Sequence, residues 1–382
     1  MNSSVDMMLH RLRENENLTK QEYTYLIEYL QQEHGDDRQA LFSLANEVRH
    51  QFYDDRVYMR GLIEFSNYCK QDCMYCGIRH SNKEVERYRL TPDQILACCE
   101  DGYGLGYRTF VLQSGEDDWF TSERMAKLIR TIKARYPDVA VTLSVGERTK
   151  ETYQAWFDAG ADRYLMRHET ASSALYAKLH PTMHFASRQR CLNDLKEIGY
   201  QVGAGFMVGL PEQTAEDLAE DLMFLKELMP HMIGIGPFIP HHNTPLYDKA
   251  GGTIDDTLVM IALSRLVVPR ALIPATTAMG SLHKRGRELA LKAGANVVMP
   301  NLSPTEVRPN YALYENKICT GDESAHCRAC IEVRIGFAGF RVDMQRGDHV
   351  GLQNETEPMI YWQQGNNHGQ ACELCEENLK FI

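Results

Sequence analysis

The sequence predicts an α/β protein whose strands close into a complete (β/α)8 TIM barrel. Short β-rich stretches alternate with amphipathic stretches that have the period of a helix. The β-rich stretches are nearly continuous in apolar residues, as expected of parallel strands buried on both faces. Eight such units follow one another between Val57 and Pro300. At about 30 residues a unit, this favours closure over the alternative, a doubly wound open sheet.

The barrel is expected over residues 55–300, between two extensions. Residues 1–54 are amphipathic and predict an N-terminal helical segment. The expected strands are RVYMRGLIEFS (56–66), TFVLQS (109–114), AVTLSV (140–145), RYLMRH (163–168), QVGAGFMVG (201–209), MIGIGPF (232–238), LIPATTA (272–278) and NVVMP (296–300). Helical stretches lie between them, and several end at a glycine, namely Gly160, Gly199 and Gly294. Residues 301–382 lose this periodicity and form a C-terminal extension that carries further cysteines.

The composition limits the partners and the location of the protein. A formal net charge of −11 argues against a broad nucleic-acid-binding face. The sequence has no run of apolar residues long enough to span a membrane, and its N-terminus has no apolar signal core. We therefore expect a cytoplasmic protein with neither a nucleic-acid nor a membrane partner.

The cysteines are grouped in a way that indicates metal binding. A cytoplasmic chain with 11 cysteines does not predict a disulfide framework, because that compartment keeps thiols reduced. Three cysteines in helical patterns are expected to be small core residues, namely Cys98, Cys99 and Cys191. Two groups of three remain, namely Cys69, Cys73 and Cys76, and Cys319, Cys327 and Cys330.

The first group lies in FSNYCKQDCMYCGIRHSN (65–82), directly after the first expected strand. Loops that follow barrel strands carry the active sites of this fold. Three cysteinates fit three corners of a 4Fe-4S cluster and leave one iron open to a small molecule. A zinc ion with three protein ligands and an open position is the alternative.

The C-x3-C-x2-C spacing, with Tyr75 before the last cysteine, resembles the radical S-adenosylmethionine superfamily. Within it the chain is similar to the FeFe-hydrogenase maturases of the HydE family, in stretches such as VLQSGED, GADRYLMRHET, GAGFMVGLPEQT, IPATTAMG and GANVVMPNLSP. Biotin synthase and methylornithine synthase share the cysteine loop but match less well in RHET and PATTAMG.

The resemblance implies an activity and its partners. S-adenosylmethionine would bind the open iron and be cleaved reductively to a 5′-deoxyadenosyl radical. The family acts in assembly of the di-iron subcluster of the hydrogenase H-cluster, on a cysteine-bound Fe(CO)2(CN) precursor. An electron donor and other hydrogenase maturases would be partners. A small-molecule mutase, a sulfur-inserting synthase and a non-enzymatic iron–sulfur scaffold are the rival functions.

The resemblance also implies which residues contact S-adenosylmethionine. They are Tyr75, Ser114, Gly115, Glu116, Ser144, Glu169, Arg188, Met207 and Tyr311. Ser114 to Glu116 could receive the ammonium group, and Arg188 could pair with the carboxylate. The alternatives are an ordinary Gly-Asp turn after the second strand, a salt bridge that ties down the loop at Glu169, and core packing for Met207.

Polar residues at strand ends predict a substrate site inside the barrel. Arg60, Arg167, Thr276 and Thr277 are expected to form an anion-binding floor. The alternative is a packing layer of hydrogen-bonded side chains.

The second cysteine group, spaced C-x7-C-x2-C, resembles an auxiliary iron–sulfur site that some members of the family carry. The resemblance implies a 2Fe-2S or 4Fe-4S cluster that activity does not need. Cys372 and Cys375 could complete a zinc or cluster site, or be unliganded thiols at a chance spacing.

Overall fold

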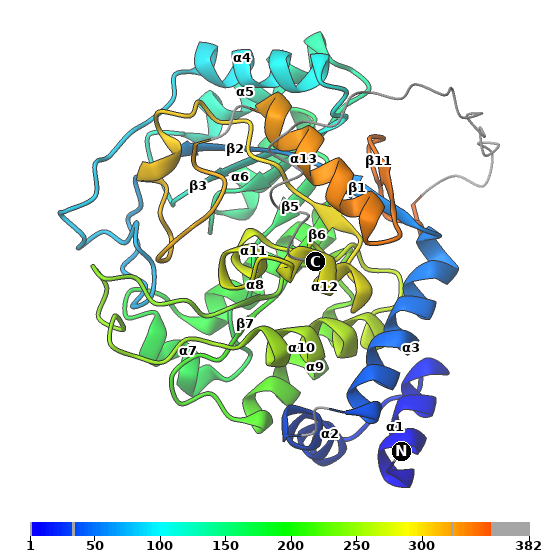
Figure 1. Ribbon diagram of the computed structural model, residues 1–382. Coiled ribbons are helices and arrows are strands. Elements are labelled where there is room, and N and C mark those ends of the chain that lie inside the picture. Colours follow the sequence, from blue (N-terminus) through cyan, green and yellow to red (C-terminus); the bar gives the residue numbers. More distant parts are fainter. Residues whose placement is uncertain (1, 33–34, 322–323, 353–382) are drawn as a thin grey trace, which may run out of the picture.

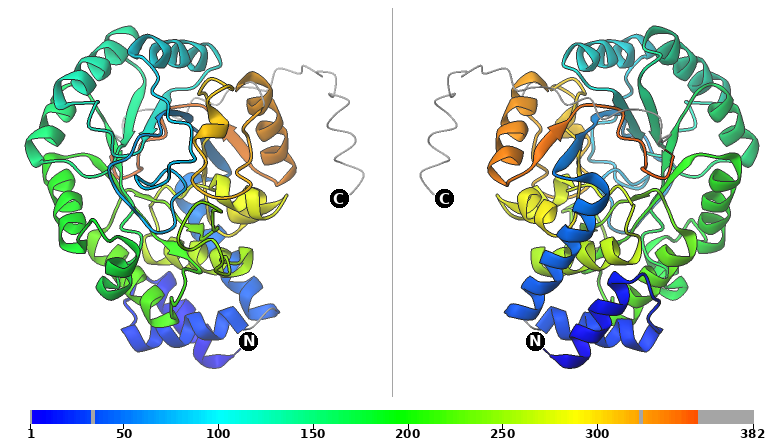
Figure 2. Two further views of the ribbon diagram at one scale, coloured as in Figure 1. Left: turned by 90° about the vertical axis from the view of Figure 1, so that its left-hand side faces the viewer. Right: turned by 90° about the vertical axis from the view of Figure 1, so that its right-hand side faces the viewer.

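The computed structural model describes residues 2–32, 35–321 and 324–352 (Figure 1). Cys372 and Cys375 therefore lie outside the described residues. Three helices precede the first strand, namely α1 (Ser3–Arg13), α2 (Lys20–Gln32) and α3 (Asp36–Tyr53). They lie on the outside of the molecule at the N-terminal end of the chain (Figure 2).

Six parallel strands form the main sheet, in the order β2-β3-β4-β5-β6-β8. They are β2 (Gly61–Ser66), β3 (Thr109–Ser114), β4 (Ala140–Ser144), β5 (Arg163–Leu165), β6 (Gln201–Ala204) and β8 (Met232–Ile233). Their residues are mostly buried, which agrees with the nearly continuous apolar stretches of the sequence. Two short strands, β7 (Met207–Val208) and β9 (Gly236–Pro237), pair with each other beyond the ends of β6 and β8.

The sheet closes into a ring, so the prediction of a complete barrel is confirmed. Closure runs through single bridges, from Met232 to Leu272 and from Pro274 to Val297. Val297 belongs to β10 (Val297–Val298), which pairs with β1 (Arg56–Met59), the stretch that leads into β2. A further bridge joins Leu62 of β2 to Asn301.

The expectation of a regular strand over 272–278 was wrong. With the described residues this stretch makes only the two bridges, and helix α11 (Thr277–Leu282) begins inside it with Thr276 as its N-cap residue. Pro274 has no N–H group to donate to a ladder, which limits regular pairing at this place.

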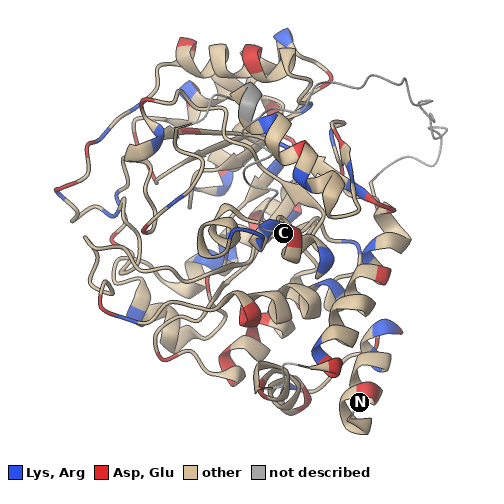
Figure 3. Cartoon of the chain, in the orientation of Figure 1, with Lys and Arg blue, Asp and Glu red and all other residues tan. Residues whose placement is uncertain are grey.

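Helices surround the ring on its outer side (Figure 2). They are α4 (Pro92–Gly104), α5 (Ser122–Arg135), α6 (Lys150–Asp158), α7 (Ser173–Leu179), α8 (Phe185–Ile198), α9 (Ala215–Leu228), α10 (Ile254–Val267) and α12 (Gly286–Lys292). In several of them a threonine side chain accepts the N–H group three residues on, as in α4, α5, α6, α9 and α10. Acidic and basic residues are interspersed along these helices (Figure 3). No helix among the described residues is both long and apolar enough to cross a membrane.

The C-terminal extension contributes to both ends of the barrel. After a 3-10 turn (Arg308–Asn310) come α13 (Ser324–Phe337) and β11 (Arg341–Asp343), and β11 pairs in parallel with β1. Residues 344–350, here called the floor segment, then cross the amino ends of the strands. Arg163, the first residue of β5, donates to the carbonyl of Arg346 at 2.7 Å and to the carboxylate of Asp348 at 2.6 Å.

Candidate active site

The three cysteines of the first group lie in the loop between β2 and α4, at the carboxyl end of the barrel. All three thiols are half-buried. Backbone bonds fix the loop to other segments. The N–H of Met74 donates to the carbonyl of Leu179, and the N–H of Gly77 donates to the carbonyl of Leu313, both at 2.9 Å. The loop is thus held between the end of α7 and the segment that follows the last strand.

Arg87 closes this loop from within. Its guanidinium donates to carbonyl groups on both sides of the cysteines, at Asn67, Ile78, Arg79 and Asn82. One planar cation with several fixed donors can gather four carbonyl groups in this way. The cysteines are therefore presented by a loop that is already ordered.

The three thiols do not lie in one close group of ligand atoms. Among the described residues, the only group of three or more His, Cys, Asp or Glu ligand atoms that all lie within 4.8 Å of one another is His241, His242 and Glu315. At least one pair of the three cysteine sulfurs is therefore more than 4.8 Å apart. Burial and the neighbouring thiols raise the pKa of Cys73, and burial raises that of Cys76 to about 12.

The Ser114–Glu116 stretch packs directly against this loop. Gly115 has no space for a side chain, because a Cβ atom there would lie 2.3 Å from the carbonyl oxygen of Tyr68. The N–H of Glu116 points at the sulfur of Cys69, at 3.4 Å. The Glu116 carboxylate is buried and accepts bonds from the Gln71 amide at 2.6 Å and the Glu147 N–H at 2.9 Å. The Ser114 hydroxyl bonds its own neighbour, the carbonyl of Gly115, at 2.7 Å.

Glu169 and Arg188 lie close to these groups. Glu169 has a positive φ of 68°, and its carboxylate lies 3.1 Å from the guanidinium of Arg167. Arg188 is buried and donates to the Glu147 carboxylate and to the carbonyl of Arg167, both at 2.8 Å. Glu147, which sequence reasoning missed, follows β4 and is the ion-pair partner of Arg188.

Tyr75 and Met207 meet in one apolar cluster. Met207 packs with Leu175, Leu179, Leu210 and Phe238, and Tyr75 lies against this cluster. The Tyr75 hydroxyl is 2.9 Å from Nε2 of His180, whose pKa burial lowers to about 3. At the carboxyl end of the barrel, here called the mouth, the side with Tyr75 and Met207 therefore offers an apolar surface, while the side with Glu116 is charged.

Inside the barrel, strand alternation separates the predicted substrate residues into layers. Arg167 lies two residues beyond Leu165, and Thr276 two beyond Pro274. Leu165 and Pro274 line a small internal cavity together with Arg60. Arg60 thus lies about 7 Å deeper than Arg167, one inward-facing layer down. Its guanidinium contacts the sulfur of Met232 and the carbonyl of Gly347 in the floor segment, both at 3.1 Å.

The prediction that Arg60 and Arg167 form one anion-binding floor is therefore wrong, because the two side chains lie in different layers of the barrel interior. Thr276 and Thr277 are half-buried at the start of α11. The Thr276 hydroxyl is a buried group that makes no hydrogen bond to any described residue.

A buried ion pair near Tyr311 was also missed by sequence reasoning. Lys317 lies 2.6 Å from the carboxylate of Glu64, which also accepts from the Asn301 amide at 2.8 Å. The Lys317 ammonium lies over the ring of buried Tyr311. In the β2–β3–β4 register Glu64 is level with Gln113 and Ser144, so these side chains belong to one inward layer. The two partners of Glu64, Asn301 and Lys317, lie more than 200 positions away in the sequence, so no local pattern links them to it.

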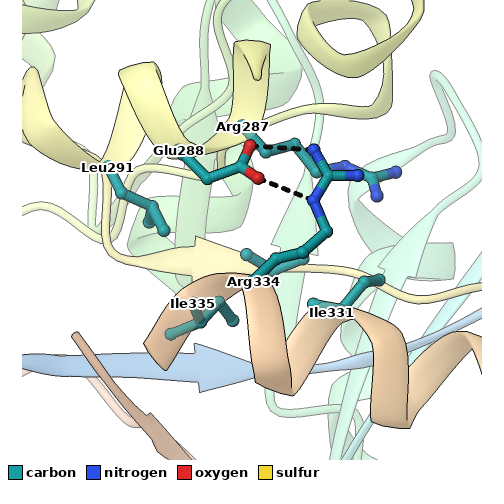
Figure 4. Close-up of a pocket in the computed structure, with 7 residues that line it drawn as sticks. Arg287, Glu288, Leu291, Ile331, Arg334 and Ile335 are labelled. Carbon is teal, nitrogen blue, oxygen red and sulfur yellow. Dashed lines mark hydrogen bonds and ion pairs between the residues drawn. The ribbon is translucent and has the colours of Figure 1, made fainter. Parts of the chain in front are cut away.

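The second cysteine group lies outside the ring. Cys327 and Cys330 belong to α13, and Cys319 precedes this helix and contacts α12. Cys327 is buried, and Cys319 and Cys330 are half-buried. Arg287 of α12 donates to the sulfur of Cys319 at 3.5 Å. The neighbouring groove between α12 and α13 holds the ion pair of Arg334 and Glu288 at 2.6 Å (Figure 4). Two arginines thus lie next to thiols that would become anionic as metal ligands.

Comparison with known proteins agrees with this geometry. Residues 63–225 match the model of the radical SAM superfamily. The chain is 48% identical over 301 residues to the [FeFe] hydrogenase maturase subunit HydE of Thermotoga maritima, covering 79% of this chain and 86% of that protein. It is 30% identical over 284 residues to the 3-methylornithine synthase of Methanosarcina acetivorans, covering 73% and 80%.

Solved structures show the same fold. A crystal structure of methylornithine synthase matches with a TM-score of 0.76 at 27% identity, covering 88% of this chain and 97% of that one. A crystal structure of HydG, a maturase of the [FeFe]-hydrogenase, matches with a TM-score of 0.75 at 20% identity, covering 90% and 77%. With the cysteine loop and the closed barrel, the identity to HydE over most of both chains shows that this chain is a radical SAM enzyme that belongs to the HydE family of hydrogenase maturases.

Proposed function

We propose that this chain cleaves S-adenosylmethionine at a 4Fe-4S cluster held by Cys69, Cys73 and Cys76, and that it acts in assembly of the di-iron subcluster of the hydrogenase H-cluster. The identity to HydE carries this proposal. The place of the three cysteines at the carboxyl end of the barrel, where this fold carries its active sites, supports it further. When bound, the cluster supplies the electron that breaks a carbon–sulfur bond of S-adenosylmethionine and so yields the 5′-deoxyadenosyl radical.

The surrounding residues bind and orient S-adenosylmethionine in this proposal. The Glu116 carboxylate and the carbonyl groups of Ser114 and Gly115 receive the ammonium group. Arg188 pairs with the carboxylate, for which it would share its guanidinium with Glu147. Tyr75 and Met207 supply the apolar surface for the adenine. Glu169, Ser144 and Tyr311 contribute the remaining polar contacts.

The substrate is proposed to be a small cysteine-bound Fe(CO)2(CN) unit that other hydrogenase maturases deliver. Arg167, Thr276 and Thr277 would hold its anionic groups at the carboxyl end of the barrel. Arg60, one layer deeper, would act only on a ligand that has moved further in. Cys319, Cys327 and Cys330 are proposed to hold an auxiliary iron–sulfur cluster, with Arg287 and Arg334 offsetting its negative charge.

Removing one thiol of the first group tests the proposal. In Cys73→Ala a corner ligand is lost, so the iron content of the anaerobically reconstituted protein should fall and formation of 5′-deoxyadenosine should cease. Cys98→Ala, which removes a buried thiol from α4, is the matched control and should retain both. A Cys73→Ala protein that makes 5′-deoxyadenosine at the wild-type rate would contradict the proposal.

A further inference from the structure

The residues at the end of β5 point in opposite directions. Arg167 and Glu169 face each other at the mouth, 3.1 Å apart. His168, between them, is turned the other way and is fully buried in the helix shell. Its ring lies between Phe206 and Phe224, with centroid distances of 5.8 Å and 4.5 Å. The cofactor site described above makes no use of this histidine.

His168 bonds a buried carboxyl group on α9. Its Nε2 atom lies 3.1 Å from Oδ1 of Asp221, and neither side chain has any exposed surface. Its Nδ1 atom accepts the N–H of Gly205 at 3.2 Å. The proton therefore sits on Nε2, and His168 donates to Asp221. Burial lowers the pKa of His168 to about 3, so the ring is neutral.

Asp221 also holds the chain on the far side of Glu169. Its Oδ1 atom accepts the N–H of Ala171 at 2.6 Å, so one carboxyl oxygen contacts groups on both sides of Glu169 in the chain. Burial raises the pKa of Asp221, and its Oδ2 atom makes no hydrogen bond to any described residue. The rest of the inner face of α9 is apolar, namely Leu218, Ala219, Leu222 and Leu225.

A polar pair in this position does little for packing. Desolvation of buried polar groups is unfavourable, and apolar side chains of similar volume often replace them at no loss of stability. The His168–Asp221 pair does, however, hold the backbone turn at Glu169, because it accepts the N–H groups of Gly205 and Ala171. Glu169 has a φ of 68°, a conformation that L-residues with a side chain rarely adopt unless their surroundings impose it. Glu169 itself bonds Gly205 and Met207 through its backbone, both at 3.0 Å.

We propose that His168 and Asp221 are positioning residues for Glu169. They hold its backbone in the left-handed conformation and so aim its carboxylate at S-adenosylmethionine. This inference rests on the proposed function, in which Glu169 contacts that cofactor. Neither residue touches the cofactor itself.

Asp221→Leu and Asp221→Asn separate this role from simple packing. Both are tested in anaerobically reconstituted protein by titration with S-adenosylmethionine and by iron analysis. The amide oxygen of Asn can still accept from His168 and Ala171, so Asp221→Asn should bind within about threefold of the wild type. Asp221→Leu removes both bonds and should weaken binding about tenfold or more, with unchanged iron content.

A double-mutant cycle with Glu169→Gln tests the link to the carboxylate. If Asp221 acts through Glu169, the double variant Asp221→Leu/Glu169→Gln should bind no more weakly than the weaker of the two single variants. Leu222→Ala is the matched control, since it creates a cavity in the same face of α9 and should leave affinity unchanged. If Asp221→Leu does not fold, His168→Leu takes its place in the cycle.

Three outcomes would overturn the inference, namely additive losses in the cycle, wild-type affinity in Asp221→Leu, or equal losses in Asp221→Asn and Asp221→Leu. Failure of the proposed function gives a different result. In that case the wild-type protein does not bind S-adenosylmethionine, or Glu169→Gln binds it normally.

Discussion

Arg167 makes two kinds of contact at the mouth of the barrel. Its carbonyl group accepts from Arg188, and its guanidinium pairs with Glu169. The first contact depends only on the backbone and survives a change of side chain. The second places a cation beside the Glu169 carboxylate at the carboxyl end of the barrel. In the proposed function, the side chain would contact the substrate, while the backbone would support Arg188 in the cofactor site.

Arg167→Leu should separate the two halves of the reaction. The backbone bond to Arg188 remains, so S-adenosylmethionine should still be cleaved, although slowly, because Glu169 loses its ion-pair partner. Maturation of hydrogenase should fail, because the proposed anionic substrate would lose the guanidinium assigned to bind it. The measurement is maturation activity beside 5′-deoxyadenosine formed without substrate turnover. Arg124→Leu, on the exposed start of α5, is the control. Normal maturation in Arg167→Leu would place the substrate elsewhere.

At this scale, the sequence predicts residues whose chemistry is local. Three cysteines within eight positions must lie close together in one loop. Gly115 could be placed in the same way, because it directly follows a predicted strand. Glu147, His168 and Lys317 could not be assigned in the same way. Each acts through a partner on another element, Arg188, Asp221 and Glu64, and no spacing in the sequence links those positions.

At the scale of elements, the floor segment shows where periodicity fails as a guide. Residues 344–350 form neither a helix nor a strand, yet their polar groups bond strand residues of the barrel floor. Asp348 accepts from Arg163 at 2.6 Å and from Gln201 at 2.7 Å, and Arg346 pairs with Asp162 at 2.9 Å. The strands that receive them were predictable from their apolar character, whereas the segment itself has no repeating pattern.

Asp348→Asn should destabilise the protein in a pH-dependent way. Burial alone would raise the pKa of Asp348, but Arg163, Arg346 and Gln201 outweigh burial and lower it. A lowered pKa in the folded state means that the stabilisation is present above the unfolded pKa of about 3.9 and is lost as the pH falls below it. At pH 7 the variant should lose about 1–3 kcal/mol of unfolding free energy.

Denaturant unfolding at several pH values measures this effect. The difference between the wild type and Asp348→Asn should shrink as the pH falls from about 5 to about 3. Asp343→Asn in β11, whose carboxylate accepts the N–H of Gln345, is the control. A difference that stays constant over this range would show that the charge of Asp348 does not contribute.

At the scale of the whole molecule, the two cysteine groups lie in different parts of the fold. The first lies at the carboxyl ends of the strands, and the second lies outside the ring, in and just before α13 and next to α12. The segment that passes from Tyr311 to Cys319 connects them, since Leu313 bonds the cysteine loop at Gly77 and Lys317 bonds Glu64. The repeating strand–helix pattern predicted the ring, but it could not predict this route, because the pattern ends with the last strand.

Removal of the second group should leave the chemistry of the first intact. In the triple variant Cys319→Ala/Cys327→Ala/Cys330→Ala, iron content and visible absorbance should fall, because the proposed auxiliary cluster would lose three ligands. Formation of 5′-deoxyadenosine should continue at the wild-type rate, because Lys317, Leu313 and their partners still hold the connecting segment. Loss of the buried Cys327 side chain should cost about 1 kcal/mol of stability. The double variant Cys98→Ala/Cys191→Ala is the control for loss of buried thiols. A folded triple variant without activity would show that the outer group supports the reaction at the mouth.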